Sequence, residues 1–238
     1  MNNFDTKIRL DNRLMSAASF VRCGSVVADI GTDHAYLPIY LLKSGIAKYA
    51  IASDVNRGPL DRAKADAARY CALDNLSFCL SDGLRDIDLD AFGVTDIVIC
   101  GMGGELMSRI IGESEYTKKE GVRLILQPMT AADDLRAFLD DAGFAVLDEK
   151  LSEAAGKTYC CILAAYDGQK RTSTDAELLV GKKTIEKREP LFEKYITNIL
   201  AKLDKKICGM KKGNLDTARE ESCRNEIKLI SEVHNDCT

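Results

Sequence analysis

The chain has 238 residues, of which 46% are hydrophobic and 29% charged, and its formal net charge is −4. This length allows a substantial core in one large domain or two smaller ones. No apolar run approaches the ~20 residues that a membrane-spanning helix needs, so we expect no membrane association. The first residues, Met1–Lys7, lack the apolar region of a signal peptide, which predicts a cytoplasmic protein.

The cysteines and histidines of the chain argue against a metal site. No two cysteines have the C-x-x-C spacing, and the two histidines are His34 and His234. Most cysteines lie inside apolar runs: Cys71, Cys79, Cys100, Cys160 and Cys161. This distribution predicts reduced, buried thiols and no bound metal.

The first strong signal is a strand, a turn and a helix near the N-terminus. Val26–Ile30 is a short β-branched run typical of a strand buried on both faces, and Asp29 lies near its end. Gly31 permits a tight turn, and a helix is predicted from about Ala35, with Pro38 in its first turn. Open α/β sheets bind ligands outside the carboxyl ends of such strands.

The turn favours a methyl donor over a dinucleotide. Where a dinucleotide site has its three glycines, this chain has Gly31, Asp33 and Tyr36. The Asp33 carboxylate would repel a pyrophosphate, but it could accept hydrogen bonds from the ammonium group of an amino acid. We therefore expect S-adenosylmethionine as the cofactor, with Asp29, Gly31, Asp33 and His34 among its contacts.

Two further acidic residues follow predicted strands. Asp54 ends the run Tyr49–Ser53 and is expected, with Val55, to bind the ribose. Asp82 follows Leu76–Ser81 and, with Gly83, is expected to bind the adenine. Each aspartate alone could equally be a helix cap or a turn residue. Three in succession, each at the start of a strand-to-helix connection, favour a cofactor site.

The middle of the chain continues the alternation of strands and helices. Strands are predicted over Asp96–Cys100 and Arg123–Leu126, helices over Glu105–Ile111 and Asp133–Ala142 with Gly143 as a cap, and a hairpin over Phe144–Leu151 and Thr158–Ala165. We therefore expect an α/β fold with five parallel strands and a terminal hairpin that contributes one antiparallel strand. This layout is typical of the Rossmann-like sheet of class I methyltransferases.

Two segments are candidates for the catalytic groups. Gly101, Met102, Gly103 and Gly104 follow a strand, and glycines there would let the backbone approach the methyl group and the substrate. Gln127 and Pro128 follow the next strand and could shape the substrate pocket. A plain tight turn and a helix-initiating proline loop are the alternative interpretations.

The C-terminal part differs in charge and in pattern. Residues 1–168 have a net charge of −7 and residues 169–238 a net charge of +3, and the polar stretch Asp167–Thr174 separates them. Apolar residues recur at helical spacing from Phe192 to Ile207 and again from Leu215 to Val233, with a break bracketed by Gly209 and Gly213. We expect an antiparallel helical hairpin. Its lysines either form an ordinary solvated surface or attract phosphates.

Three segments resemble signatures of the bacterial tRNA (adenine-22) N(1)-methyltransferase family. They are Asp29–Pro38, Ile99–Gly104 and Leu124–Pro128, and Leu179–Gly181 resembles a further one. The resemblance spans nearly the whole chain and implies a methyltransferase domain over 1–168 and a helical, coiled-coil-like tRNA-binding domain over 169–238. Members often carry Asn after Gln-Pro, whereas this chain has Met129.

The resemblance implies methyl transfer from S-adenosylmethionine to the ring N(1) of adenine 22 in tRNA. We expect the protein to be a monomer. Ring N(1) is a neutral nucleophile, so proximity and alignment would suffice and no strong general base is needed. Two other functions remain open from the residues alone. The protein could methylate another RNA or a small molecule, or bind RNA without catalysis.

Overall fold

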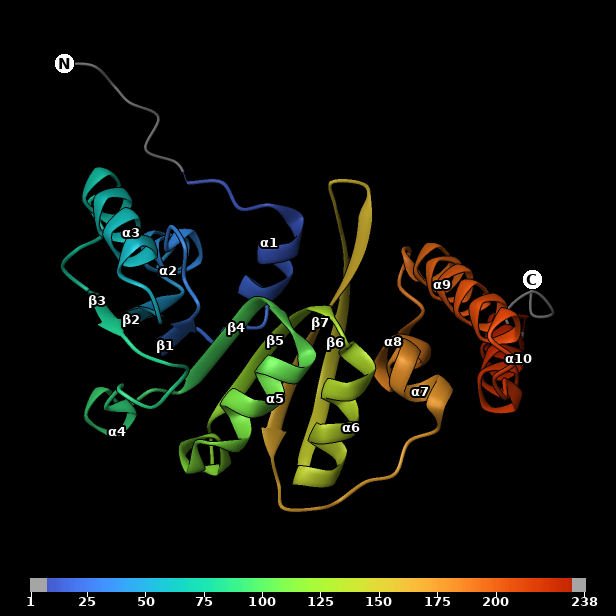
Figure 1. Ribbon diagram of the computed structural model, residues 1–238. Coiled ribbons are helices and arrows are strands. Elements are labelled where there is room, and N and C mark those ends of the chain that lie inside the picture. Colours follow the sequence, from blue (N-terminus) through green and yellow to red (C-terminus); the bar gives the residue numbers. More distant parts are fainter. Residues whose placement is uncertain (1–7, 233–238) are drawn as a thin grey trace.

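The computed structural model describes residues 8–232 as a seven-stranded sheet flanked by helices (Figure 1). Predictions that involve Met1–Lys7, Val233 and His234 lie outside the described residues. The strands are β1 (Ser25–Ile30), β2 (Ala47–Asp54), β3 (Leu76–Leu80), β4 (Asp96–Gly103), β5 (Arg123–Thr130), β6 (Phe144–Ala154) and β7 (Lys157–Tyr166). The helices are α1 (Asn12–Ala18), α2 (Tyr36–Lys43), α3 (Arg57–Arg69), α4 (Leu89–Phe92), α5 (Gly104–Gly112), α6 (Ala132–Ala142), α7 (Asp175–Val180), α8 (Lys182–Lys187), α9 (Phe192–Lys212) and α10 (Ala218–Glu232), with a 3-10 turn at Glu115–Lys118.

The strand order is β3-β2-β1-β4-β5-β7-β6, with β1 to β5 parallel and β7 antiparallel to both of its neighbours. This arrangement confirms the predicted five parallel strands, the terminal hairpin and the Rossmann-like fold. After β3 the chain crosses the sheet to β4, which lies on the other side of β1, so the strand order reverses between β1 and β4. Open α/β sheets bind ligands at such a switch point.

The alternation of side chains along β1 builds one core on each face of the sheet. Val26, Ala28 and Ile30 belong to the apolar cluster that includes residues of α5 and α6. Val27 belongs to the opposite cluster, with residues of α1, α2 and α3. Successive side chains of a strand point to opposite faces, so a fully apolar strand is buried on both.

The ends of β4 and β5 extend further than predicted. Gly101–Gly103 form the irregular last residues of β4 rather than a separate loop, and register shifts occur on both sides of Met102. Gln127 and Pro128 lie inside β5, where Pro128 is opposite Met102. The long-range pairing of these two strand ends overrides the local turn signals of glycine and proline.

The helical C-terminal part is confirmed, with two corrections. Gly209 lies inside α9, so the break falls at the connection between α9 and α10 instead. Leu215 is in that connection and is 62% exposed, so it does not start the second apolar stripe. The ion pairs Lys206–Glu220 and Arg224–Asp204 join α9 to α10 as an antiparallel pair.

The cysteine prediction holds only in part. Eight cysteines are free among the residues of the structure, and Cys160, Cys161 and Cys223 are buried. Cys71 is exposed because the chain turns there, with a positive φ of 52°, after α3. Cys79 and Cys100 are half-buried.

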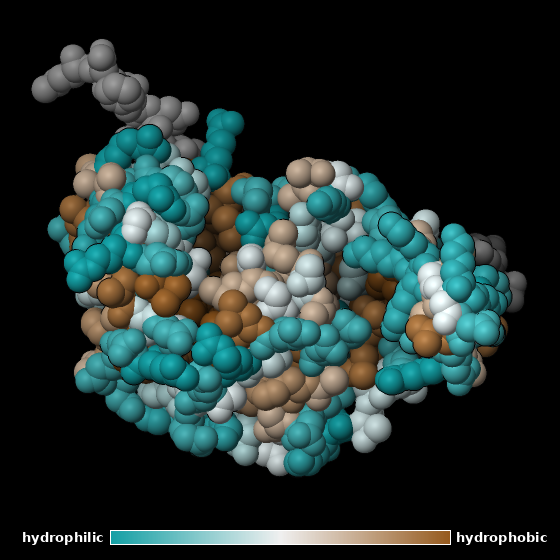
Figure 2. Space-filling model, in the orientation of Figure 1, coloured by the Kyte–Doolittle hydropathy of each residue, from teal (hydrophilic) through white to brown (hydrophobic). Residues whose placement is uncertain are grey.

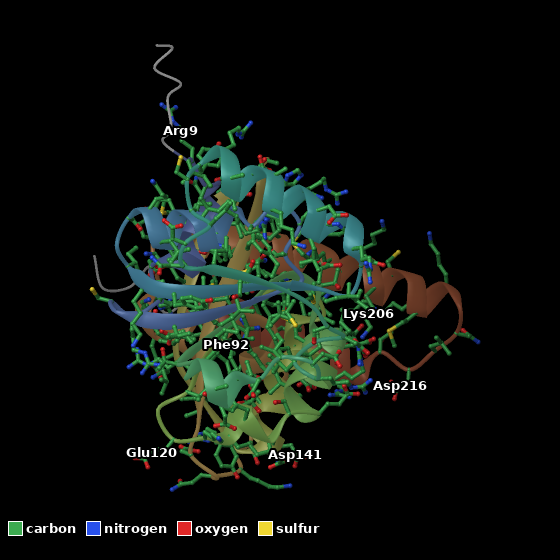
Figure 3. The ribbon with its side chains drawn as sticks, turned by 90° about the vertical axis from the view of Figure 1, so that its left-hand side faces the viewer. Arg9, Phe92, Glu120, Asp141, Lys206 and Asp216 are labelled. Atoms are coloured by element: carbon green, nitrogen blue, oxygen red, sulfur yellow. The ribbon has the colours of Figure 1, made fainter. Side chains whose placement is uncertain are left out.

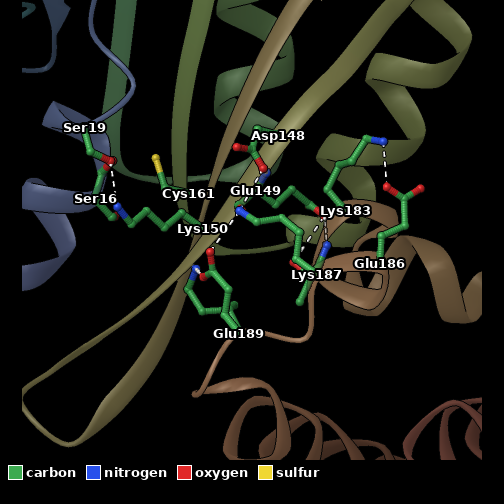
Figure 4. A network of polar contacts seen from close by, with 12 residues as sticks. Ser16, Ser19, Asp148, Glu149, Lys150, Cys161, Lys183, Glu186, Lys187 and Glu189 are labelled. Carbon is green, nitrogen blue, oxygen red and sulfur yellow. Dashed lines mark hydrogen bonds and ion pairs between the residues drawn. The ribbon is translucent and has the colours of Figure 1, made fainter. Parts of the chain in front are cut away.

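A buried ion pair joins the C-terminal helices to the sheet. Arg136 of α6 donates to Glu149 of β6 at 2.7 Å and also to the backbone carbonyl of Leu178 in α7. The Glu149 carboxylate accepts from the backbone and the hydroxyl of Thr184 in α8. Around this pair, Lys187 of α8 donates to Asp148 and to the Glu149 carbonyl, as Figure 4 shows. The sheet and the C-terminal helices therefore share one polar junction.

Candidate active site

The backbone conformation of the turn after β1 favours glycine. Gly31 has a φ of +78°, and the flexible end of the Met102 side chain lies 2.0 Å from the position that a Cβ would take. The backbone N–H groups of Gly31 and Thr32 both donate to the carbonyl of Ser53 at 2.8 Å. The ends of β1, β2 and β4 are therefore held together around one glycine.

Asp29 places a buried carboxyl group beside this turn. It is only 7% exposed, and burial raises its pKa to about 6, although a hydrogen bond from Thr32 opposes the shift. The group is thus mostly ionised at pH 7. A buried carboxylate without an ion-pair partner among the described residues favours a cationic ligand.

Asp33 and His34 lie at the edge of the site and are engaged by other side chains. Arg62 of α3 donates to the Asp33 carboxylate at 3.1 Å and 2.5 Å. His34 Nδ1 lies 2.7 Å from Asp66, and its ring stacks on Tyr36 with centroids 5.0 Å apart. Asp33 therefore has an arginine partner that the sequence did not indicate. The roles of both residues toward a cofactor stay predictions.

The end of β2 carries the aspartate expected to bind a ribose. Asp54 Oδ1 accepts from the backbone N–H of Asn56 at 2.8 Å, and the Asp54 carbonyl accepts from Ser81. Among residues 8–232, Asp54 Oδ2 has no hydrogen-bond partner. Val55 is 59% exposed beside it. The carboxylate is thus oriented by its own turn and has one oxygen available for a ligand.

Asp82 follows β3, and its carboxylate is partly neutralised. Arg109 of α5 donates to Asp82 at 3.0 Å and Arg85 at 3.3 Å, and the hydrogen bond from Arg109 lowers the pKa of Asp82. Gly83 has a φ of +65°, and a Cβ there would lie 3.0 Å from Ile110. An adenine amino group would have to share Asp82 with these arginines, so its predicted role remains untested.

The glycines at the end of β4 have different surroundings. A Cβ on Gly104 would lie 1.9 Å from the backbone oxygen of Ala131, so close packing of α5 excludes any side chain there. A Cβ on Gly103 would lie 3.1 Å from the Thr130 hydroxyl. Gly101, with a φ of +80°, is exposed and faces Arg13. Gly104 is thus explained by packing, and Gly101 and Gly103 are open to a functional role.

Gln127 makes hydrogen bonds within the protein at the end of β5, and its predicted role in shaping the substrate pocket stays a prediction. The side chain is fully buried, its oxygen accepts from Arg13 at 2.7 Å, and its nitrogen donates to the Pro128 carbonyl at 2.9 Å. Gln127 therefore connects the end of β5 to α1. The sequence analysis missed Arg13, since no local pattern links residues 114 positions apart.

These strand ends form one surface. In Figure 1 the carboxyl ends of β1 and β4 meet below α1 and beside α2 and α3. Figure 2 shows apolar residues in the hollow between the region of α3 and the end of β4. Within the described part of the chain, no group of three or more His, Cys, Asp or Glu side chains is arranged to bind a metal ion.

Comparison with known proteins identifies the family. Residues 10–162 match the model of a methyltransferase domain family. The tRNA (adenine(22)-N(1))-methyltransferase of Bacillus subtilis is 36% identical over 206 residues, which cover 82% of each chain. This chain belongs to the tRNA (adenine(22)-N(1))-methyltransferase family.

Solved structures agree with this family assignment. The crystal structure of the B. subtilis m1A22 tRNA methyltransferase TrmK has a TM-score of 0.78 and 30% identity, and the match covers 95% of this chain and 99% of that one. A Streptococcus pneumoniae protein, described as a candidate tRNA (m1A22) methyltransferase and solved with S-adenosyl-L-methionine, has a TM-score of 0.81 and 31% identity, with 93% and 99% covered. The resemblance and fold predicted from the sequence are thereby confirmed.

Proposed function

We propose that this protein transfers the methyl group of S-adenosylmethionine to the ring N(1) of adenine 22 in tRNA. The observation that carries the proposal is the 36% identity to the B. subtilis tRNA (adenine(22)-N(1))-methyltransferase over 82% of both chains. The geometry of the strand ends supports it. Gly31 forms the tight turn beside them, and the carboxylates of Asp29 and Asp54 offer charge and a free acceptor oxygen.

When bound, S-adenosylmethionine supplies an activated methyl group on a sulfonium. Asp29 stabilises its positive charge from the end of β1, and Asp54 accepts hydrogen bonds from the ribose hydroxyls. The remaining cofactor contacts of the proposal are Gly31, Asp33, His34, Val55, Asp82 and Gly83.

The protein contributes to the transfer step by positioning the base and the methyl group, and no proton transfer is needed. Ring N(1) of adenine has a free lone pair at neutral pH, so alignment of the base with the methyl group supplies most of the rate enhancement. The backbone of Gly101, Met102 and Gly103 contacts the base, and Gln127 and Pro128 of β5 pack beside this segment. The base must leave its stack to reach this segment, which costs on the order of a few kcal/mol.

Residues 169–238 form the tRNA-binding part of the proposal, and residues 1–168 the methyltransferase part. In α9, Lys206 and Lys211 pair with Glu220 and Glu221 of α10. Lys202 and Lys205 are exposed and, within the described residues, have no carboxylate partner, so they are the better candidates for phosphate contacts. Figure 3 shows Lys206 on α9 and Asp216 in the connection to α10, apart from Glu120 and Asp141.

The setting of the reaction is also part of the proposal. Residues 8–232 contain no helix with the length and hydropathy to cross a bilayer. We propose that the protein acts as a monomer in the cytoplasm, where tRNA is modified.

Incubation with labelled donor and bulk tRNA, followed by nucleoside analysis, tests the proposal. We expect label in N(1)-methyladenosine. Label in another nucleoside, or only in small molecules, would show that adenine N(1) of tRNA is not the substrate. Tight donor binding without transfer to any RNA would instead indicate a protein that binds RNA but does not catalyse.

A further inference from the structure

Glu149 of β6 holds the bend between α7 and α8. Its buried carboxylate accepts hydrogen bonds from the backbone N–H of Thr184 at 3.0 Å and from the Thr184 hydroxyl at 3.2 Å. Gly181, the residue between the two helices, has a φ of +99°, and a Cβ there would lie 2.2 Å from a Glu149 carboxylate oxygen. The carboxylate cannot move away without losing its contacts, so the bend requires a residue without a side chain.

Arg136 of α6 holds the other side of the same bend. Its Nε donates to Glu149 at 2.7 Å, and its Nη1 donates to the carbonyl of Leu178, near the end of α7, at 2.7 Å. The Arg136 side chain is 5% exposed, and that of Glu149 is fully buried. One buried ion pair therefore contacts the end of α7 and the start of α8, with Lys187 beside Glu149 in Figure 4.

Apolar packing leaves the direction of these two helices less defined. A cavity of about 220 Å³ lies between α6, β6 and the helices, and most of its lining is charged, including Arg171, Lys182 and Glu186. Apolar contacts have no directional preference, whereas hydrogen bonds weaken steeply when donor and acceptor are misaligned. A buried ion pair adds little net stability, because its desolvation offsets much of the attraction. Its main effect here is to fix the orientation of α7 and α8.

The orientation of α7 and α8 determines where the helical pair α9–α10 lies. Arg219 of α10 contacts Asp175 of α7 at 2.6 Å, and α8 leads through a short connection into α9. Lys202 and Lys205 lie about 15–20 Å along α9 from its first residue, at a rise of about 1.5 Å per residue. A rotation of α9 by about 15° about its start would move these lysines by roughly 4–5 Å, more than a hydrogen bond tolerates.

We infer that the Arg136–Glu149 pair positions the tRNA-binding helices relative to the methyl donor. This role rests on the proposed function, in which α9 contacts tRNA and the ends of β1 and β4 hold the donor. Arg136 and Glu149 act through α7 and α8 and contact neither the donor nor the base. The segment Leu179–Gly181, which has no part in the proposed transfer step, forms the bend that the pair holds.

Methylation kinetics of the double variant Arg136→Met with Glu149→Leu test this role. The double change removes both charges together, and apolar replacement of a buried ion pair often leaves stability unchanged. The kcat/KM for tRNA should fall roughly 10- to 100-fold, because a small misplacement of the substrate is costly. The affinity for S-adenosylmethionine, measured by calorimetry, and the melting temperature should stay unchanged. Gly181→Ala displaces Glu149 from the helix side while both charges remain, and it should give the same result.

Arg22→Met with Asp96→Leu is the matched control, since this pair, in contact at 2.9 Å with Asp96 fully buried, lies at the start of β4. It should change neither the kcat/KM for tRNA nor the donor affinity. An unchanged kcat/KM for tRNA in the folded Arg136→Met, Glu149→Leu protein would overturn the assignment. So would equal losses of kcat/KM for tRNA and of donor affinity, because the pair would then support the whole fold. If the double variant does not fold, Gly181→Ala decides between these results. If the unmodified protein binds the donor but methylates no tRNA, the proposed function itself fails.

Discussion

The carboxyl group of Asp29 links the stability of the protein to its candidate site. Its pKa is about 6 in the folded protein against an ordinary value of 3.8, because burial disfavours the charged form. Between these values the folded state binds more protons than the unfolded chain. The free energy of unfolding therefore falls as pH rises through this window, by roughly 3 kcal/mol in total.

Asp29→Asn should remove this penalty. We expect the variant to be more stable than the unmodified protein at pH 8, by up to roughly 3 kcal/mol, and to differ little at pH 4. It should also lose affinity for the cationic donor. Urea unfolding at the two pH values measures the stability difference, and an equal effect at both would contradict the buried-charge explanation.

Asp54 is tested by donor affinity alone. Because one carboxylate oxygen is available for the ribose, Asp54→Ala should weaken S-adenosylmethionine binding by roughly 1.5–3 kcal/mol. Isothermal titration calorimetry measures the change, and circular dichroism checks the fold. Unchanged affinity in a folded variant would exclude the ribose assignment.

Alanine substitutions at Gly103 and Gly104 separate a functional role of the β4 end from a packing role. Gly103 has an ordinary φ of −74°, and a Cβ would approach only the Thr130 hydroxyl, so Gly103→Ala should fold. It should lower the single-turnover methylation rate more than donor affinity, because it crowds the reacting groups. Gly104→Ala should instead destabilise the fold, since its Cβ would meet backbone at 1.9 Å. If Gly103→Ala lowers the methylation rate and the donor affinity equally, Gly103 lines the donor pocket and does not contact the substrate base.

At the scale of elements, the strands could be predicted because β-branched runs such as Val26–Ile30 and Arg123–Leu126 carry their own signal. Their ends could not, because the pairing of Met102 with Pro128 depends on residues distant in sequence. Gly209 similarly gave a false break: α9 packs its apolar stripe against the core, and this packing outweighs the helix cost of one glycine.

The lysines of α9 can be tested without disturbing the stripe. Lys202→Glu together with Lys205→Glu should weaken tRNA binding. The slope of log binding constant against log salt concentration should become shallower by about one unit per lost phosphate contact. Lys206 is a poor choice for charge reversal, because a glutamate there would face Glu220. Fluorescence titrations across salt concentrations measure the effect, with donor affinity as the control. Unchanged affinity and slope would place the RNA elsewhere.

At the scale of the whole molecule, the helical part is not separated from the sheet by a solvated gap. Phe192, Ile196 and Ile207 of α9 belong to the same apolar cluster as Leu126 of β5. Removing the chain after Asp167 would expose this surface and leave the buried Arg136–Glu149 pair without its helix partners. Charge reversal is therefore a cleaner test of tRNA binding than truncation.

The family segments and the order of acidic strand ends were visible in the sequence, and they identified the overall fold. The arginine partners of Asp33 and Asp82, and the contact of Arg13 with Gln127, were not visible. Each joins side chains on different elements, and only the folded chain brings them together. The sequence therefore predicted the fold better than the charge balance at the candidate site.

Methylation of two tRNA transcripts tests the central claim most directly. One carries adenine at position 22, and the other differs only by guanine at that position. With S-adenosylmethionine present, the account predicts N(1)-methyladenosine at position 22 of the first transcript, located by primer-extension arrest, and no transfer to the second. Equal methylation of both transcripts, or of neither while the donor binds, would contradict it.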